Sequence, residues 1–244
     1  MTSRYLLHIA YNGKNYHGWQ KQHNARTVQQ EVEEKLSLLL GENIETLGCG
    51  RTDTGVHAKS YYLHFDSRVE IEQHVFLFKL NQILPYDIAA YGISKVDAEF
   101  NARFDALCRT YEYCITAVKD PFLHDYAWYQ YGALDMETMN ACAQKLIGTH
   151  DFECFSKVHT QVNNFVCEVT EAYWQRQNHT LVFTITANRF LRNMVRAIVG
   201  TLVDAGRGKI SQPEFEAILN SKSRSEAGQS VPAHGLYLTR IQYK

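Results

Sequence analysis

Hydrophobic and polar residues alternate along much of this chain, and elsewhere the apolar residues recur at helical spacing. The alternating segments predict strands at residues 4–11, 44–49, 57–65, 88–96, 109–118, 165–175, 180–187 and 236–243. Helical spacing predicts helices at residues 71–83, 136–146, 189–205 and 212–219. Strands and helices therefore occur in mixed order along the sequence.

A further helix is expected to begin directly after Thr27. Thr27 and Gln30 have the spacing of a capping box, in which the two residues satisfy backbone N–H groups at a helix start. The apolar residues that follow fall on one helical face: Val28, Val32, Leu36 and Leu39. The sequence thus predicts both the beginning of this helix and its buried side.

The order of these elements predicts an α+β fold, in which helices pack on a central and mostly antiparallel sheet. No low-complexity tract or proline-rich linker interrupts the chain. We expect two similar α+β halves, residues 1–105 and residues 106–244.

Composition narrows the class of protein. The chain has 244 residues, of which 45% are hydrophobic and 21% charged, as in folded globular proteins. Because the sequence shows neither a secretory signal nor an apolar stretch long enough to span a bilayer, we expect a soluble cytoplasmic protein. The net charge of −1 does not by itself indicate a nucleic-acid partner. Evidence for such a partner has to come from basic residues that lie together on one surface.

Several kinds of site have no sequence signature here. The six cysteines form no Cys-x-x-Cys pair, and His150-Asp151 has no second cluster at metal-ligand spacing. A phosphate-binding Gly-rich loop, a dinucleotide fingerprint and a Ser-His-Asp signature are likewise missing. We therefore expect neither a metal nor a cofactor.

The segment 51–55 is the most unusual local feature, because small and polar residues are concentrated there between two apolar strands. In one interpretation Asp53 forms a simple Asx-turn and Gly55 supplies a positive φ. In the other, Arg51 keeps Asp53 ionised, and the fixed carboxylate is a nucleophile for covalent catalysis at a sugar carbon. Spacing alone does not decide between them.

Arginines and tyrosines supply two weaker signals. On the helix predicted at 189–205, Arg189, Arg192 and Arg196 fall within one arc opposite the apolar residues, which suits either an anion-binding surface or a solvated face. Tyr111 and Tyr113 lie on one face of a predicted strand, where packing in the core is favoured over stacking on a base.

Taken in order, segments along almost the whole chain resemble the tRNA pseudouridine synthase A (TruA) family. The matching segments are Tyr11-Asn12-Gly13 through Gly18-Trp19-Gln20, Thr27-Val28-Gln29, Gly50-Arg51-Thr52-Asp53 through Gly55-Val56-His57-Ala58, Leu80-Asn81 through Leu84-Pro85, Ala102-Arg103-Phe104, Arg109 through Tyr113, Gly148 through Phe152, Phe190-Leu191-Arg192 through Arg196, and Pro232-Ala233 through Leu236. Each segment alone is weak, but their shared order and spacing are specific.

The resemblance implies two α+β halves around a central antiparallel sheet, an RNA-binding cleft between the halves, and a homodimer that binds tRNA with both subunits. It implies an isomerase that converts uridine to pseudouridine at positions 38, 39 and 40 of the anticodon stem-loop, in tRNA numbering, without a cofactor. Two positions depart from the family pattern: Thr54 stands where alanine is usual, and Tyr61 where glutamine is frequent.

The resemblance also assigns roles to individual residues. Asp53 matches the catalytic aspartate, and Arg51 matches the arginine that holds the target base out of the helix. Tyr111 matches the tyrosine that packs on that base, and Arg196 the basic residue that pairs with the aspartate. The residues expected to contact RNA are Arg189, Arg192, Arg103 and His57.

Two other functions are consistent with parts of this reading. A catalytically inactive paralogue would keep the fold and bind tRNA as a chaperone does, but binding alone has little use for the carboxylate of Asp53. A glycosidase would need a pair of carboxylates, and Asp53 has no convincing carboxylate partner by motif.

Overall fold

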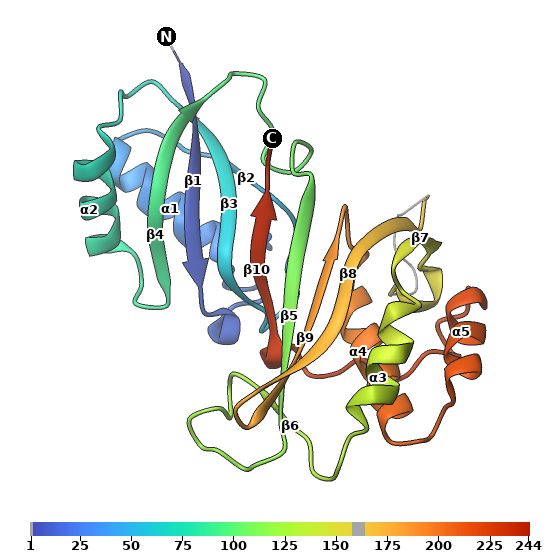
Figure 1. Cartoon of the computed structure of the whole chain (residues 1–244). Coiled ribbons are helices and arrows are strands. Elements are labelled where there is room, and N and C mark those ends of the chain that lie inside the picture. Colours follow the sequence, from blue (N-terminus) through green and yellow to red (C-terminus); the bar gives the residue numbers. More distant parts are fainter. Residues whose placement is uncertain (1, 158–163) are drawn as a thin grey trace. The chain divides into compact units, whose positions relative to one another are not determined.

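The computed structural model describes residues 2–157 and 164–244, and these residues form two compact units (Figure 1). The first unit is the chain up to Leu107 together with Leu238–Lys244, and the second is Cys108–Tyr237. Each unit contains a sheet and helices, which confirms the predicted α+β class. The last residues of the chain thus belong with its beginning, an arrangement that the two consecutive halves expected from the sequence do not contain.

The sheet of the first unit has the strand order β4-β1-β3-β10, with β2 on β3. Its elements are β1 (Ser3–Tyr11), α1 (Val28–Leu40), β2 (Thr46–Gly48), β3 (His57–Ser67), α2 (Gln73–Ile83), β4 (Ile88–Val96) and most of β10 (Leu236–Gln242). The pairs β1–β3, β1–β4 and β2–β3 are antiparallel. Alternate residues of β1 are buried, so one face of the strand packs in the core.

Helix α1 begins as the sequence predicts. The Thr27 side chain accepts a hydrogen bond from the Gln30 backbone N–H, while the Gln30 side chain bonds Glu34 and so leaves the capping box half formed. Val28, Val32 and Leu36 are fully buried. The helix ends at Gly41, whose φ of 70° suits glycine.

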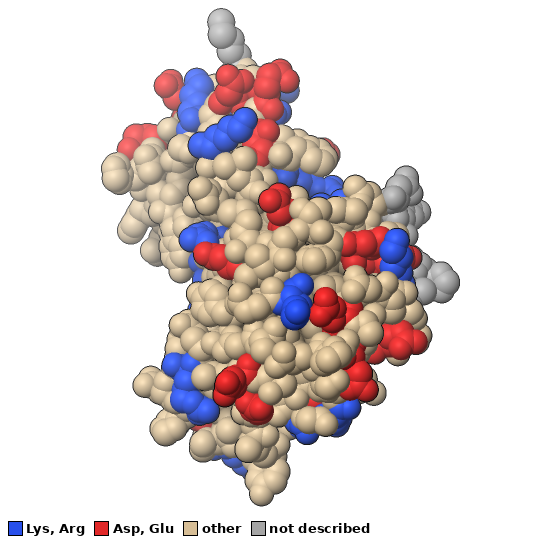
Figure 2. Space-filling view, turned by 45° about the vertical axis from the view of Figure 1, so that its right-hand side comes forward, with Lys and Arg blue, Asp and Glu red and all other residues tan. Residues whose placement is uncertain are grey.

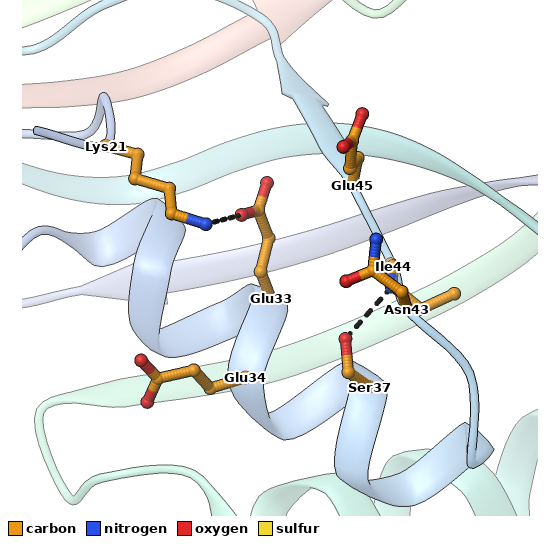
Figure 3. A pocket seen from close by; sticks show the side chains of 7 residues that line it. All are labelled: Lys21, Glu33, Glu34, Ser37, Asn43, Ile44 and Glu45. Atoms are coloured by element: carbon orange, nitrogen blue, oxygen red, sulfur yellow. Dashed lines mark hydrogen bonds and ion pairs between the residues drawn. The ribbon is translucent and has the colours of Figure 1, made fainter.

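A hollow of about 360 Å³ lies beside α1 and is lined by Lys21, Glu33, Glu34, Ser37, Asn43, Ile44 and Glu45 (Figure 3). Glu33 is buried at its wall. One carboxylate oxygen accepts hydrogen bonds from the backbone N–H and hydroxyl of Thr46 at 2.9 and 3.1 Å, and the other pairs with Lys21 Nζ at 3.3 Å. Glu33 therefore ties α1 to β2.

The sheet of the second unit has the order β5-β9-β8-β7, with β6 parallel to β5. Its strands are β5 (Cys108–Thr116), β6 (Trp128–Tyr129), β7 (Gly148–Asp151), β8 (Val166–Gln177) and β9 (Thr180–Ala187). Its helices are α3 (Met136–Gln144), α4 (Met194–Gly206) and α5 (Gln212–Asn220). The apolar helix α4 is buried along most of its length and packs against α3 and α5.

Helix α4 begins at Met194, so the prediction of a helix from residue 189 is wrong. Asn193 has the left-handed conformation, with φ 67° and ψ 1°, and a residue in that conformation cannot continue an α-helix. Arg189 and Arg192 consequently lie in the loop before the helix, and Arg196 alone of the three lies on it. The single helical arc of arginines does not exist.

No helix within residues 2–157 and 164–244 is long and apolar enough to cross a membrane.

Candidate active site

Asp53 lies in a tight turn between β2 and β3. The Val56 N–H donates to the Asp53 carbonyl at 3.1 Å, and Gly55 has a φ of 78° that favours glycine. Asp53 is half-buried, while Arg51 and Thr54 are exposed. The turn that the sequence suggested is present, and Asp53 is not fully buried in it.

The loop after β1 supports this turn from one side. The Gly13 N–H donates to His57 Nδ1 at 3.1 Å, and the Gly55 N–H donates to the Tyr16 carbonyl at 3.2 Å. A Cβ on Gly13 would lie 1.9 Å from the Val56 carbonyl oxygen. Glycine is required where the loop backbone touches the turn.

Gly18 makes a second close approach in the same loop. It has a φ of 85°, and a Cβ there would lie 2.2 Å from the Thr52 carbonyl oxygen. The Thr52 hydroxyl forms a buried hydrogen bond of 2.9 Å with the Tyr11 hydroxyl. Backbone and side chain of Thr52 are thus both fixed directly beside Asp53.

Asp87 anchors the supporting loop, a role that the sequence analysis missed. Its carboxylate accepts a hydrogen bond of 2.6 Å from the Tyr16 hydroxyl, and its carbonyl accepts one of 2.9 Å from the Asn12 N–H. Burial and the neighbouring Asp87 carboxylate raise the pKa of Tyr16. An aspartate after Leu84-Pro85 reads locally as an ordinary turn residue, and only its long-range contacts reveal the role.

His57 is 2% exposed, and its Nδ1 accepts the Gly13 N–H. It thus joins the supporting loop to β3, and its contact with RNA stays a prediction. Arg103 is exposed, and its guanidinium lies 5.3 Å above the ring of Phe104. The first unit therefore holds Arg51, Asp53 and His57 in one continuous segment, with Arg103 in a different loop.

In the second unit, Tyr111 on β5 is half-buried, and its ring meets that of Phe190 edge-on at 5.0 Å. Tyr113, two residues further on, is fully buried and donates to the Pro232 carbonyl at 2.8 Å. Burial raises the pKa of Tyr113. Tyr113 has the core position that the sequence favoured, whereas Tyr111 packs against the loop that carries Arg189 and Arg192.

Arg196 lies in the first turn of α4 and is held in place by the segment around Val231. Its Nε donates to the Val231 carbonyl at 2.7 Å, and its own carbonyl accepts the Val231 N–H at 3.2 Å. Asn193 donates from its side chain to Ser230 Oγ at 2.6 Å, which joins the same segment to the start of the helix. The guanidinium of Arg196 is therefore half-buried and oriented.

The two arginines before α4 differ in their surroundings. Arg189 is half-buried near Cys167, where its charge opposes the burial that raises the pKa of the thiol to about 11. Arg192 is exposed, and its carbonyl accepts the Lys157 N–H at 3.0 Å. Arg192 is accordingly the more solvent-exposed of the two.

Charge and metal-ligand groups add little to this picture. On the face shown in Figure 2, Lys and Arg are interspersed with Asp and Glu, so the described residues in view do not form a patch of one sign. Within the parts of the chain that the structure describes, no three His, Cys, Asp or Glu side chains are grouped so as to hold a metal ion.

Comparison with known proteins defines first the class and then the family. A family model described as tRNA pseudouridine synthase matches residues 142–244. A tRNA pseudouridine synthase A of Parabacteroides distasonis is 48% identical over 241 residues, covering 98% of this chain and 96% of the relative. One from Porphyromonas gingivalis is 47% identical over 245 residues, with 99% and 97% covered. One from Bacteroides thetaiotaomicron is 44% identical over 243 residues, with 98% and 90% covered. The chain belongs to the tRNA pseudouridine synthase A family.

Proposed function

We propose that this chain converts uridine to pseudouridine at positions 38, 39 and 40 of the tRNA anticodon stem-loop, with Asp53 as the nucleophile. Membership of the family makes it a tRNA pseudouridine synthase, an isomerase that acts on RNA. The observation that carries the role of Asp53 is its turn: the backbone on both sides is fixed, while Asp53 itself is only half-buried.

The reaction needs a nucleophile but no net addition of atoms. The bond from ribose C1′ to uracil N1 breaks, the base turns, and a new bond forms from C1′ to C5. The hydrogen on C5 leaves as a proton and N1 acquires one, so the composition is unchanged. A carboxylate such as Asp53 holds one half of the substrate covalently while the other turns.

The target uridine must leave the base stack before Asp53 reaches it. In our proposal Arg51 helps to hold the target base out of the helix, and the ring of Tyr111 packs on the base. Stacking of this kind contributes about 1–3 kcal/mol per base. In the same proposal Arg196 pairs with the Asp53 carboxylate once bound tRNA excludes water from the site. These roles require Tyr111 and Arg196 to meet Asp53 in one cleft.

An enzyme that modifies several neighbouring uridines is expected to recognise the backbone and shape of the RNA more than the identity of its bases. Arg189, Arg192, Arg103 and His57 are the proposed RNA contacts. Exposure supports Arg192 and Arg103, whereas the burial of His57 makes it the weakest of the four. We propose a homodimer in which one tRNA contacts both subunits.

The test uses unmodified tRNA transcript tritiated at uridine C5, without cofactors. The wild-type protein should release tritium, Asp53→Ala should not, and Asp97→Ala, which changes an exposed aspartate of the same unit, should match the wild type. Release by Asp53→Ala at the wild-type rate would overturn the role of Asp53. Binding without release by the wild type would favour an inactive tRNA-binding paralogue. Carbodiimide-dependent primer extension then maps the modified positions.

A further inference from the structure

Three aromatic side chains pack together beneath the segment that carries Arg51 and Asp53. The Tyr61 ring lies 4.3 Å from that of Trp19 and 5.5 Å from that of Tyr11, between ring centroids. Tyr61 is fully buried, and the other two are at most 4% exposed. The three side chains come from β1, β3 and the loop after β1, and together they form a closely packed support under this segment.

The residues of this cluster form hydrogen bonds with both neighbours of Arg51, Gly50 and Thr52. The Tyr61 hydroxyl donates to the Gly50 carbonyl at 2.5 Å. The Tyr11 hydroxyl bonds the Thr52 hydroxyl, and the backbone N–H of Trp19 donates to the Thr52 carbonyl at 3.4 Å. Both neighbours of Arg51 are held, while the Arg51 side chain itself is exposed.

The chain before Gly50 is fitted closely around the Tyr61 hydroxyl. A Cβ on Gly48 would lie 2.1 Å from that oxygen and 2.7 Å from the Trp19 indole. The Cys49 N–H donates to the Tyr62 carbonyl at 2.8 Å, so the next residue is also bound to β3. The Tyr61 hydroxyl therefore holds the backbone at Gly48 and Gly50, where the chain leaves the sheet toward Asp53.

We propose that Tyr61 is a positioning residue for the isomerisation. Its hydroxyl fixes the Gly50 carbonyl, and through that contact it fixes where Arg51 and Asp53 stand relative to the substrate. The inference rests on the proposed role of Asp53. Tyr61 touches neither the base nor the ribose, so it acts on the rate of the chemical step and not on the affinity for tRNA.

Tyr61→Phe removes the hydroxyl and keeps the ring, and Tyr62→Phe is its matched control. Tyr62 is the next residue of β3 and has its ring stacked on His8 at 4.4 Å, on the other face of the strand. We expect Tyr61→Phe to lower kcat about tenfold or more at a KM within about twofold of wild type. Tyr62→Phe should leave both constants near their wild-type values.

Replacement of Tyr61 by p-aminophenylalanine, through a suppressed stop codon, returns an N–H donor at the same place and should restore most of kcat. A structural role alone would change the urea unfolding midpoint without this split between kcat and KM. A wild-type kcat for Tyr61→Phe, a rise in KM alone, no rescue by the amine, or failure of Tyr61→Phe to fold would each overturn the inference. Tritium release by the wild type and its loss in Asp53→Ala are measured in parallel, so failure of the proposed function is recognised separately.

Discussion

Gly13→Ala is the sharpest test of how the turn that carries Asp53 is supported. Gly13 is buried, and a Cβ built on it lies 1.9 Å from the carbonyl oxygen of Val56 and 2.6 Å from the carbonyl carbon. Gly13 has no positive φ, so alanine at this position suffers from the close approach alone. Because the opposing atoms are backbone, no side chain can rotate away.

The size of the effect follows from the geometry. Cβ contacts below 3.0 Å are essentially never seen, so loop and turn must separate by at least about 1.1 Å. That movement also stretches the hydrogen bond from the Gly13 N–H to His57 Nδ1. A misplacement of about 1 Å can lower a rate about 100-fold, which corresponds to roughly 2.7 kcal/mol in the activation barrier.

The assay is the single-turnover rate of tritium release at saturating enzyme, with the urea midpoint measured on the same preparations. Gly92→Ala is the matched control, because a Cβ on this β4 glycine of the same unit meets nothing within 4 Å. We expect Gly92→Ala to keep the wild-type rate. A folded Gly13→Ala protein that also keeps it would refute the claim that this contact positions Asp53.

Three further predictions concern stability and RNA binding. Glu33→Gln should lower the free energy of unfolding in urea by about 1–3 kcal/mol, because the amide removes the charge that strengthens the Thr46 hydrogen bonds and turns an NH2 donor toward Lys21 Nζ. Glu34→Gln, at an exposed neighbour, should change it by less than about 0.5 kcal/mol. The Nδ1 of His64 accepts the Ala102 N–H, and burial lowers the pKa of His64. As the pH falls, the unfolded chain therefore binds a proton at this residue before the folded protein does, and the urea midpoint should decrease from about pH 7 to about pH 5. His64→Asn keeps an acceptor, and its midpoint should decrease less over the same range. Arg192→Glu should weaken tRNA binding and reduce the slope of log affinity against log salt by about one, and an unchanged slope would count against a phosphate contact.

Local sequence patterns predicted the helices and strands correctly where neighbouring residues determine the structure. The cap at Thr27 and the apolar face of α1 were predicted because both depend on residues a few positions apart. The start of α4 was not, because periodicity does not reveal that Asn193 adopts a left-handed conformation. The error moved Arg189 and Arg192 from a helix into a loop and removed the shared arc on which their grouping had been based.

In the candidate site, too, the sequence predicted the local features and missed the long-range contacts. Asp53 was found because its turn is compact in sequence, and the family resemblance chose the catalytic interpretation over the plain one. The roles of Asp87 and of the contact between Tyr61 and Gly50 could not be predicted from the sequence. The first contact joins residues 71 positions apart and the second joins residues 11 apart across a turn, and neither spacing has a recognisable pattern. Supporting contacts of this kind show no local pattern, although they hold the turn that carries the proposed nucleophile.

The return of β10 to the first unit has a consequence for the order of biosynthesis. β10 neighbours β3 there, and Tyr243 donates from its hydroxyl to the Ala102 carbonyl at 2.7 Å. A ribosome that has completed Leu107 must still add 135 residues before this strand is complete. At 5–20 residues per second this takes roughly 7 to 27 s, during which the nascent first unit has an uncovered sheet edge. The turn that carries Asp53 is translated early, but the sheet that supports it is completed only after β10 has been synthesised.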